Sequence, residues 1–341
     1  MLYNYRKSGV KKLISQRLNS RRFIGRRLIR KRPPVVWKEA SCIINPRAAN
    51  HKWERKKRLR KYIQKRLPGP AYDSHGSKEA SVRLARELSQ NHRLIVVIGG
   101  DGTISDVIQG IMEGGNNRQV RVGIIPFGSG NAFRHSLDIP KTVGAAVDLL
   151  TKGREKAADV IRVNGRFGEF INVGMSAAIG YLKHAHRVPG MLGHFLASRI
   201  QPFYRRHWVD VELEDGIDDQ GQTFDRIKLR LKILDCIVTK ITHFGYGWLV
   251  APRAVIDDGY LDITFFEMRT PTYFVLFPFT FLGLLQRRLR HYKAKRAVLR
   301  GKRLPIQYNG EDLPFQDVIE LEVVPHAIRL IVPPKGSDLH I

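Results

Sequence analysis

Residues 94–111, LIVVIGGDGTISDVIQGI, constrain the fold of this chain more than any other part of the sequence. The first five are apolar and mostly β-branched, which predicts a short buried strand of a parallel sheet. Gly99, Gly100 and Gly102 then allow a tight turn, and Thr103 is positioned to cap the amphipathic helix that follows. A strand, a glycine-rich turn and a helix N-terminus present backbone N–H groups and the positive end of a dipole, which suits a phosphate.

Asp101 lies in the middle of this turn, where an anion is expected to bind. A carboxylate is better explained there if it lies beside a metal ion, or if it accepts a proton or a hydroxyl hydrogen bond. A structural role, in which Asp101 only caps the turn, is the alternative that the pattern leaves open. Asp101 is therefore a candidate catalytic residue.

Strands and helices are predicted to alternate on both sides of this element. Residues 40–46, ASCIINP, are typical of a buried strand, and residues 77–88 of an amphipathic helix. Residues 120–126, VRVGIIP, predict another strand, and residues 141–151 a short helix. This alternation favours a parallel sheet, so residues 38–157 are expected to form a doubly wound α/β domain.

From residue 158 the sequence changes to short segments of alternating polarity, and Asn164-Gly165 between two of them predicts a β-hairpin. Residues 319–332 predict two closing strands, IELEVV and AIRLIV. The length of 341 residues allows a second domain. We expect a β-rich domain over residues 158–332 and a tail at 333–341.

The positive charge is concentrated at the N-terminus. Residues 1–66 contain 23 Lys and Arg against two acidic residues, so +21 of the net charge of +28 lies there. Residues 1–37 read as a basic extension, either an amphipathic helix on an anionic membrane surface or a solvated tail. A targeting presequence is an open alternative, whereas no nucleic-acid partner is expected because the basic residues are not interleaved with aromatic residues that could stack on bases.

Two further features bear on location. Cys42 and Cys236 give no disulfide framework, so a reducing, cytoplasmic compartment is expected. Residues 273–285, YFVLFPFTFLGLL, are nearly all apolar but too few for a membrane span, which needs about 20 residues. They suit insertion into a bilayer interface, the lining of a lipid pocket or a core helix. Peripheral membrane association is the expectation.

The GGDGT motif at residues 99–103, followed by a strand and PFGSGN at residues 126–131, resembles the diacylglycerol kinase, sphingosine kinase and bacterial lipid kinase superfamily. The resemblance extends from about Ser41 to the C-terminus. It implies a Rossmann-like, NAD kinase-like α/β domain followed by an antiparallel β-sandwich, and a C-terminal segment that returns to the first domain. It also implies Mg²⁺-dependent transfer of the γ-phosphate of ATP to a hydroxyl of a membrane lipid, diacylglycerol-like or sphingoid, in a cleft between the domains.

The resemblance assigns ATP binding to residues of three loops. The chain lacks the Gly-x-x-x-x-Gly-Lys-Ser/Thr pattern, so backbone amides and a metal ion would hold the phosphates. The residues implied are Asn45, Gly99, Gly100, Gly102, Thr103, Gly128, Ser129 and Asn131.

A third match, residues 245–266, resembles the family segment with an Asp-Gly-x-Leu-Asp motif. By this resemblance Asp258 would bind a Mg²⁺ ion that holds the loop in shape. An ordinary Asp-Asp-Gly hairpin turn is the alternative.

Residues 307–313, QYNGEDL, resemble the family's Asp-Gly-Glu motif. Glu311 would then be the general base that takes the proton of the lipid hydroxyl, and Asp101 would help to hold Mg²⁺ or orient that hydroxyl. Asn309 stands where the family has an acid, and it can orient a group but cannot take a proton. This departure keeps open an impaired enzyme that only binds lipid or nucleotide, and an NAD kinase-like enzyme is a further alternative.

Overall fold

The computed structural model describes residues 39–48, 57–67, 69–185 and 204–334, which belong to one compact unit. The predicted basic extension at residues 1–37 lies outside the described residues. So do residues 51–56, directly before α3 (Lys57–Arg66), and residues 335–341 of the predicted tail.

The first half of the chain contains the predicted parallel sheet. Strands β1 (Ala40–Ile44), β2 (Ala71–Asp73), β3 (Leu94–Gly99) and β4 (Arg121–Pro126) are all parallel, in the order β2-β1-β3-β4. Every residue of β1 and β3 is buried, which explains why both sequences are apolar apart from Ser41 in β1.

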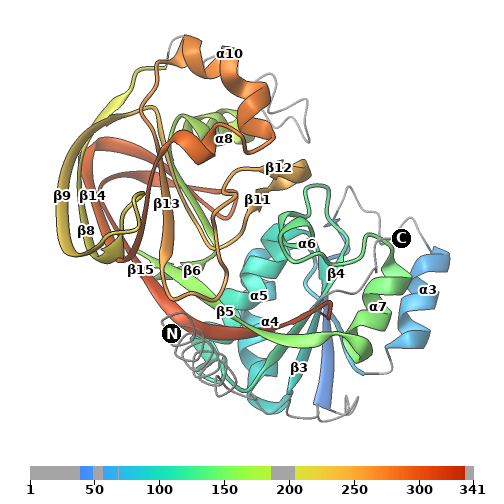
Figure 1. Cartoon of the computed structure of the whole chain (residues 1–341). Helices are drawn as coiled ribbons and strands as arrows, with labels where there is room; N and C mark the ends of the chain where they lie inside the picture. Colours follow the sequence, from blue (N-terminus) through green and yellow to red (C-terminus); the bar gives the residue numbers. More distant parts are fainter. Residues whose placement is uncertain (1–38, 49–56, 68, 186–203, 335–341) are drawn as a thin grey trace, which may run out of the picture. The chain divides into compact units, whose positions relative to one another are not determined.

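Helices cover both faces of these strands, as Figure 1 shows. α4 (Lys78–Asn91) packs against α5 (Asp101–Gly114), and α3 packs against α7 (Val143–Lys152). The short helix α6 (Ala132–Ser136) follows the loop after β4. The predicted doubly wound α/β arrangement is confirmed.

The prediction that Thr103 caps a helix is wrong. α5 begins two residues earlier, at Asp101, with Gly100 as its N-cap, and no described side chain bonds that cap. Thr103 lies buried in the first turn, where its Oγ1 accepts a hydrogen bond from Asn45 Nδ2 at 2.9 Å. Glycine allows the helix to begin directly after the strand, so the threonine is free to bond the neighbouring loop.

The second half consists mainly of antiparallel strands. The predicted hairpin is confirmed, because β5 ends at Val163, β6 begins at Arg166, and the two strands are antiparallel. The strands are β5 (Arg154–Val163), β6 (Arg166–Gly168), β7 (Phe170–Gly174), β8 (His207–Ile217), β9 (Thr223–Ile233), β10 (Asp235–Thr239), β11 (His243–Phe244), β12 (Trp248–Leu249), β13 (Leu261–Phe266), β14 (Arg290–Tyr308) and β15 (Glu311–Val332). The helices are α8 (Met175–Ala185), α10 (Thr270–Phe281) and the 3₁₀ turns η4 (Gly245–Gly247) and η5 (Gln286–Arg288).

Strand β15 replaces the two closing strands that the sequence predicts. It runs for 22 residues, pairing first with β14 and then with β5, and its register shifts between Val324 and Ile328. Pro325 lies inside this irregularity and interrupts the ladder of hydrogen bonds, because proline has no N–H to donate. The strand continues on both sides, so the irregularity is a bulge and not a loop. Near its end, Arg329 and Leu330 pair in parallel with β4, so one continuous sheet joins both halves.

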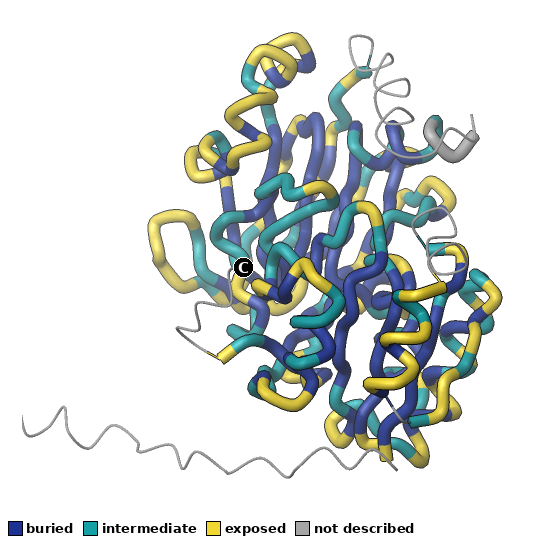
Figure 2. Tube along the Cα trace, turned by 90° about the vertical axis from the view of Figure 1, so that its right-hand side faces the viewer, coloured by how far each residue is buried: buried dark blue, intermediate teal, exposed yellow. Residues whose placement is uncertain are grey.

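The buried apolar residues form two clusters, one around the parallel strands and one within the antiparallel strands. β15 contributes to both, with Leu330 in the first cluster and Leu321 in the second. Figure 2 shows the central strands of both halves as buried.

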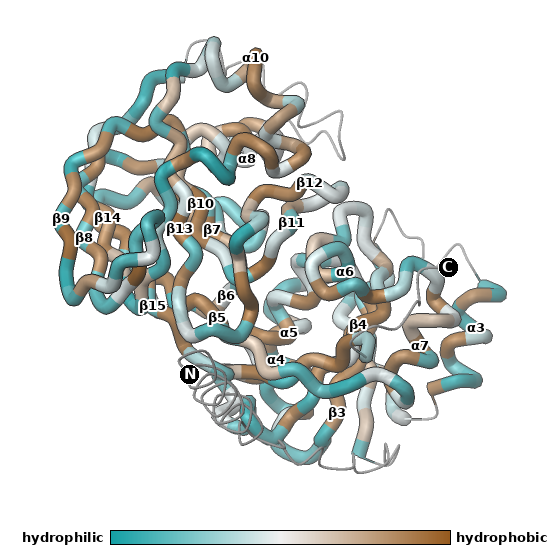
Figure 3. Tube along the Cα trace, viewed as in Figure 1, coloured by the Kyte–Doolittle hydropathy of each residue, from teal (hydrophilic) through white to brown (hydrophobic). Residues whose placement is uncertain are grey.

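Helix α10 is an exception to this burial. It is mostly apolar along its length, as the brown stretches of its tube in Figure 3 indicate, yet many of its side chains are exposed. The alternative of a plain core helix for residues 273–285 is therefore excluded.

The loops after β3 and β4 touch each other through their backbones. A Cβ atom added to Gly128 would lie only 2.5 Å from the Cα of Gly100 and 3.0 Å from Asn131 Oδ1. Nothing lies within 4 Å of a Cβ atom added to Gly102. Close approach therefore requires glycine at position 128, whereas position 102 faces open space.

These two glycines give a matched test of the loop contact. We expect Gly128→Ala to lower the free energy of unfolding by about 1–3 kcal/mol, because the added methyl group overpacks the contact between the loops. Gly102→Ala should cause no loss of stability. Denaturant unfolding of the two variants measures the difference, and equal stabilities would contradict the contact.

Candidate functional site

A pocket of about 350 Å³ lies at the carboxyl ends of β1, β3 and β4, the edge of an open α/β sheet where ligands generally bind. Loops distant in sequence form its wall. Seven of the residues predicted for the site line it: Asn45, Gly100, Gly102, Thr103, Gly128, Ser129 and Glu311.

Side-chain hydrogen bonds hold the loops of this pocket in place. Asn45 Oδ1 accepts the N–H of Arg47 at 3.0 Å, while its amide donates to Thr103. Asn131 Oδ1 accepts the N–H of Gly128 at 3.1 Å, and Asn131 Nδ2 donates to the Gly128 carbonyl at 3.0 Å. Gly99 packs directly against the side chain of Thr103. Asn131 and Gly99, both predicted to bind nucleotide, thus support the loops.

The pocket is suited to an anion. The N-termini of α4 and α5 both border it, through Ser77 and Lys78 of the first and Gly100 and Gly102 of the second. Exposed N–H groups and the two helix dipoles favour negative charge there. The Lys78 ammonium forms an ion pair with the Glu311 carboxylate and lies 5.7 Å from the centre of the Tyr308 ring.

Lys78 is not among the site residues predicted from the sequence, although a lysine in the first turn of a helix can indicate a nearby anion. The helix dipole disfavours a cation at that end, so a compensating anion could have been inferred.

Asp106 was also missed. It lies one turn beyond Gly102 on α5 and lines the pocket. Burial, and then the neighbouring charge of Glu311, raise the pKa of Asp106 to about 7, and Lys78 acts in the opposite direction. Asp106 and Glu311 are therefore two carboxyl groups that would gain from a cation between them.

Asp101 lies in a neighbouring cavity of about 160 Å³. Its Oδ1 accepts the N–H of Phe133 at 3.2 Å, which positions the carboxyl group against the start of α6. Burial raises the pKa of Asp101, while backbone hydrogen bonds from the start of α6 oppose that rise. The cavity is also lined by Ser105, Ala132, Phe133, Glu169, Phe170, Ile241, Phe244, Gly245, Tyr246, Asn309 and Gly310.

The two predicted catalytic residues thus line different sites. The turn between β14 and β15 contributes to both, because Asn309 and Gly310 line the cavity of Asp101 while Glu311 lines the anion pocket. Asn309 has a φ of 48° and Gly310 a φ of 83°, the left-handed pair that a two-residue hairpin turn requires.

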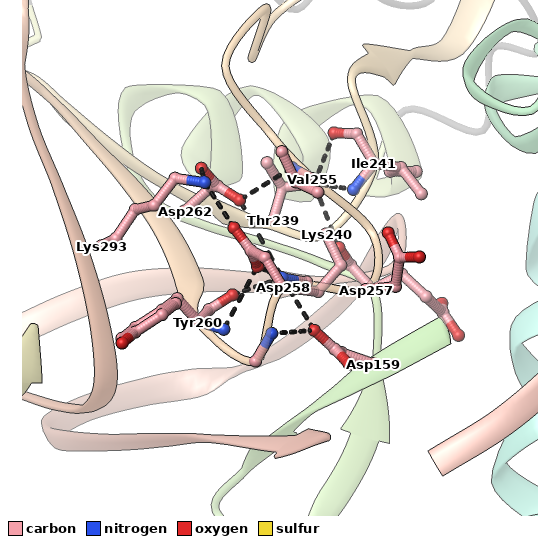
Figure 4. Close-up of polar contacts among 12 residues, drawn as sticks. Asp159, Thr239, Lys240, Ile241, Val255, Asp257, Asp258, Tyr260, Asp262 and Lys293 are labelled. Carbon is pink, nitrogen blue, oxygen red and sulfur yellow. Dashed lines mark hydrogen bonds and ion pairs between the residues drawn. The ribbon is translucent and has the colours of Figure 1, made fainter. Parts of the chain in front are cut away.

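Asp258, the predicted Mg²⁺ ligand, lies in a separate cluster (Figure 4). The Lys240 ammonium lies 2.7 Å from Asp258 Oδ1 and 3.2 Å from Asp159 Oδ2, and it donates to the Tyr260 carbonyl. Lys293 forms an ion pair with the other Asp258 oxygen. Although burial acts to raise it, hydrogen bonds from the two lysines hold the pKa of Asp258 below its ordinary value.

This cluster fits an ammonium better than a metal ion. Lys240 is only 1 % exposed and contacts the side-chain and carbonyl oxygens that would otherwise face a cation. No group of three or more His, Cys, Asp or Glu side chains among the described residues is arranged to hold a metal. Magnesium at Asp258 therefore stays a prediction, and the residues present do not favour it.

Substitution of Lys240 tests which cation holds the cluster. Removing one member of a buried ion pair costs about 3–5 kcal/mol, so Lys240→Met should lower the free energy of unfolding by about that amount. Lys228→Met, at an exposed lysine 4.0 Å from Glu212, should change it by less than about 1 kcal/mol. A chelator should leave the wild-type unfolding curve unchanged, whereas chelator-induced destabilisation would indicate a bound metal.

Comparisons with known proteins agree with this architecture. A family model of the diacylglycerol kinase catalytic domain matches residues 39–163, and a model of the YegS C-terminal NAD kinase beta sandwich-like domain matches residues 171–332. The expected α/β domain and antiparallel β-sandwich are thus confirmed.

Similar proteins are named diacylglycerol kinases. A diacylglycerol kinase of Staphylococcus saprophyticus is 30 % identical over 200 residues, which cover 58 % of this chain and 62 % of the relative. One of Staphylococcus carnosus is 27 % identical over 233 residues, 66 % of this chain and 72 % of the relative. The crystal structure of a diacylglycerol kinase from Bacillus anthracis shares the fold, with a TM-score of 0.64, 20 % identity, and coverage of 88 % of this chain and 99 % of that one.

The resemblance first seen in GGDGT and PFGSGN is confirmed by these matches. The chain belongs to the family of proteins in which a diacylglycerol kinase catalytic domain is followed by a YegS-type β-sandwich domain.

Proposed function

We propose that the chain is an ATP-dependent lipid kinase, which transfers the γ-phosphate of ATP to a hydroxyl group of a membrane lipid. One observation carries the proposal: an anion pocket and an apolar-walled cavity with carboxyl groups both border the turn at residues 309–311. Phosphoryl transfer needs a phosphate site and an acceptor site side by side, and little covalent chemistry from the protein.

The anion pocket would hold the phosphates of ATP. Backbone N–H groups at the N-termini of α4 and α5, together with Lys78, would bind the phosphate oxygens. Mg²⁺ bound with ATP would neutralise phosphate charge, and Asp106 and Glu311 are the carboxyl groups best placed to hold it. The ion pair between Glu311 and Lys78 positions that carboxylate at the phosphates.

The cavity of Asp101 would hold the acceptor. Phe133, Phe170 and Phe244 among its walls suit an apolar body better than a nucleotide, which favours a lipid over the NAD of the alternative kinase. Asp101, in the wall of the same cavity, would orient the hydroxyl group.

Helix α10 would reach the membrane in which such a lipid lies. Val275 is 76 % exposed and Leu282 is 61 % exposed, and Arg269, Arg287 and Arg288 are exposed at the ends of this segment. An apolar surface bordered by cations suits the interface of an anionic bilayer. None of the helices in the described residues is long and apolar enough to cross a membrane.

Transfer of labelled phosphate tests the proposed activity. The full chain is incubated with γ-labelled ATP, Mg²⁺ and mixed micelles of total lipid extract, beside the variants Asp101→Asn and Glu311→Gln. We expect an organic-phase product that both variants lose by about 10²-fold or more, since each removes a charge aimed at the reacting groups. Glu320→Gln, at an exposed carboxylate of the same strand β15, should keep full activity.

Other products would lead to other conclusions. Absence of label on any lipid, while ATP still protects the chain from heat, would indicate a nucleotide-binding protein without this activity. Label on NAD alone would indicate an NAD kinase.

Vesicle binding tests the role of α10. Val275→Glu combined with Leu282→Glu should weaken binding to anionic vesicles by more than tenfold, because burying each apolar side chain contributes about 1.5–3 kcal/mol. Val318→Glu, at an exposed apolar position on β15, is the control and should bind as the wild type does. Equal vesicle flotation by all three proteins would contradict a membrane contact through α10.

A further inference from the structure

Two residues that line the cavity of Asp101 each have a buried side-chain atom with no hydrogen-bond partner within the described part of the chain. These atoms are Glu169 Oε1 and Asn309 Nδ2. A buried polar group without a partner costs about 1–3 kcal/mol, so two of them in one cavity need a reason. A bound ligand that supplies both partners is such a reason.

The other polar atoms of these two side chains are engaged, which fixes their orientation. Glu169 Oε2 accepts a hydrogen bond from Ser105 Oγ at 3.1 Å. Asn309 Oδ1 accepts the N–H groups of Glu169 at 3.1 Å and of Phe170 at 3.0 Å. Because those donors are backbone groups, the amide nitrogen of Asn309 must be the atom left over, and it is a donor. The cavity therefore offers one hydrogen-bond donor and one carboxyl oxygen.

A hydroxyl group satisfies both atoms at once, since it donates one hydrogen bond and accepts others. An ammonium group cannot accept from Asn309 Nδ2, and a carbonyl oxygen cannot donate to the ionised carboxylate of Glu169. Resting on the proposed function, we infer that Asn309 and Glu169 bind the hydroxyl group of the acceptor lipid, and that Glu169 takes its proton during transfer.

The chemical step balances without a further reactant. The hydroxyl oxygen forms a bond to the γ-phosphorus, and the bond from that phosphorus to the oxygen bridging the β- and γ-phosphates breaks. ADP leaves with the electron pair, and the hydroxyl proton passes to Glu169 Oε1, from which water later removes it.

This inference changes the meaning of the asparagine at position 309. The position lies in the left-handed region, where Asn, Asp and Gly are favoured, so its backbone accepts an acid or an amide equally. In this pair, Asn309 orients the hydroxyl group and Glu169 supplies the carboxyl group. The two residues are linked by the hydrogen bond from the backbone N–H of Glu169 to Asn309 Oδ1. The carboxyl group is present in the cavity but comes from the segment between β6 and β7.

The electrostatic setting suits a base. Glu169 is 2 % exposed, and this burial raises the pKa of its carboxyl group to about 8. The hydroxyl of Ser105 and the backbone N–H of Glu169 oppose this rise, and Asp101 and Asp106 on α5 add to it. Burial, and then the charge of Glu169, in turn raise the pKa of Tyr308 on β14. A general base is most effective when its pKa lies near the working pH.

The test uses the full chain, ATP, Mg²⁺ and the alcohol lipid labelled in the micelle assay, with a short-chain diacylglycerol as the first choice. Glu169→Gln should lower kcat by about 10²–10⁴-fold, the usual contribution of a general base. Its stabilisation by ATP in a thermal shift should equal that of the wild type, since the anion pocket is untouched. Wild-type kcat should rise with pH up to about 8, because only the ionised carboxylate accepts a proton, and the variant should lose that rise.

Moving the carboxyl group from position 169 to position 309 separates the loss of a proton acceptor from a loss of packing. Glu169→Gln combined with Asn309→Asp returns one carboxyl group to the cavity, and we expect it to recover kcat at least tenfold over Glu169→Gln alone. Asn164→Asp is the matched control, because Asn164-Gly165 forms the same left-handed turn elsewhere, and it should leave kcat unchanged. Should Glu169→Gln fail to fold, Asn309→Gly keeps the turn and removes the donor, and it should raise KM for the lipid and lower kcat.

The outcomes distinguish this inference from the proposed function. Transfer by the wild type that persists in Glu169→Gln with the same kcat and pH profile would overturn the role of Glu169 and leave the kinase standing. Absence of transfer to any lipid by the wild type would overturn both.

Discussion

The two-residue turn between β14 and β15 is the constraint on which both candidate sites depend. It places Asn309 and Gly310 in one cavity and Glu311 in the adjoining pocket, so residues two positions apart line the two candidate sites. The turn is held from outside as well, since the N–H of Asn309 donates to the Phe170 carbonyl at 2.8 Å and Lys78 binds Glu311. β15 then continues into the parallel sheet beside β4, which ties the geometry of the turn to both halves of the chain.

Two sets of buried or partly buried acids in this fold differ in how their charge is compensated. Around Lys240, Asp159 and Asp258 meet ammonium groups directly, as buried charges in a stable core must. Around the candidate site, Glu169 is buried and Asp101 and Asp106 are partly buried, all with less compensation, and the pKa of each is raised. A carboxyl group with a raised pKa lowers the stability of the fold but can transfer a proton or bind a cation. Such groups are therefore often found at functional sites.

Local sequence patterns were sufficient for the order of strands and helices and for the glycine loops, because both depend on residues close in sequence. They were insufficient wherever the partner is remote. Lys78 and Glu311 are 233 positions apart, and Glu169 and Asn309 are 140 apart, so neither pair has a signature in sequence. The error at Thr103 has the same origin, since its bond to Asn45 spans 58 positions. The bulge in β15 was mistaken for a break because Pro325 interrupts the pattern without ending the strand.

If Glu169 is the base that we infer, position 309 illustrates how a motif can change while its chemistry is retained. The turn demands a left-handed conformation, so asparagine fits there as well as the acid of the family motif. Replacement of that acid removes a carboxyl group from the cavity unless a neighbour supplies one, and a neighbour must face the same space without disturbing the turn. Glu169 meets both conditions, because its backbone N–H is bound by Asn309 itself, it lines the same cavity, and its carboxyl oxygen Oε1 has no partner among the described residues. A departure from the motif is therefore weak evidence of lost activity until the residues around the cavity have been compared in space.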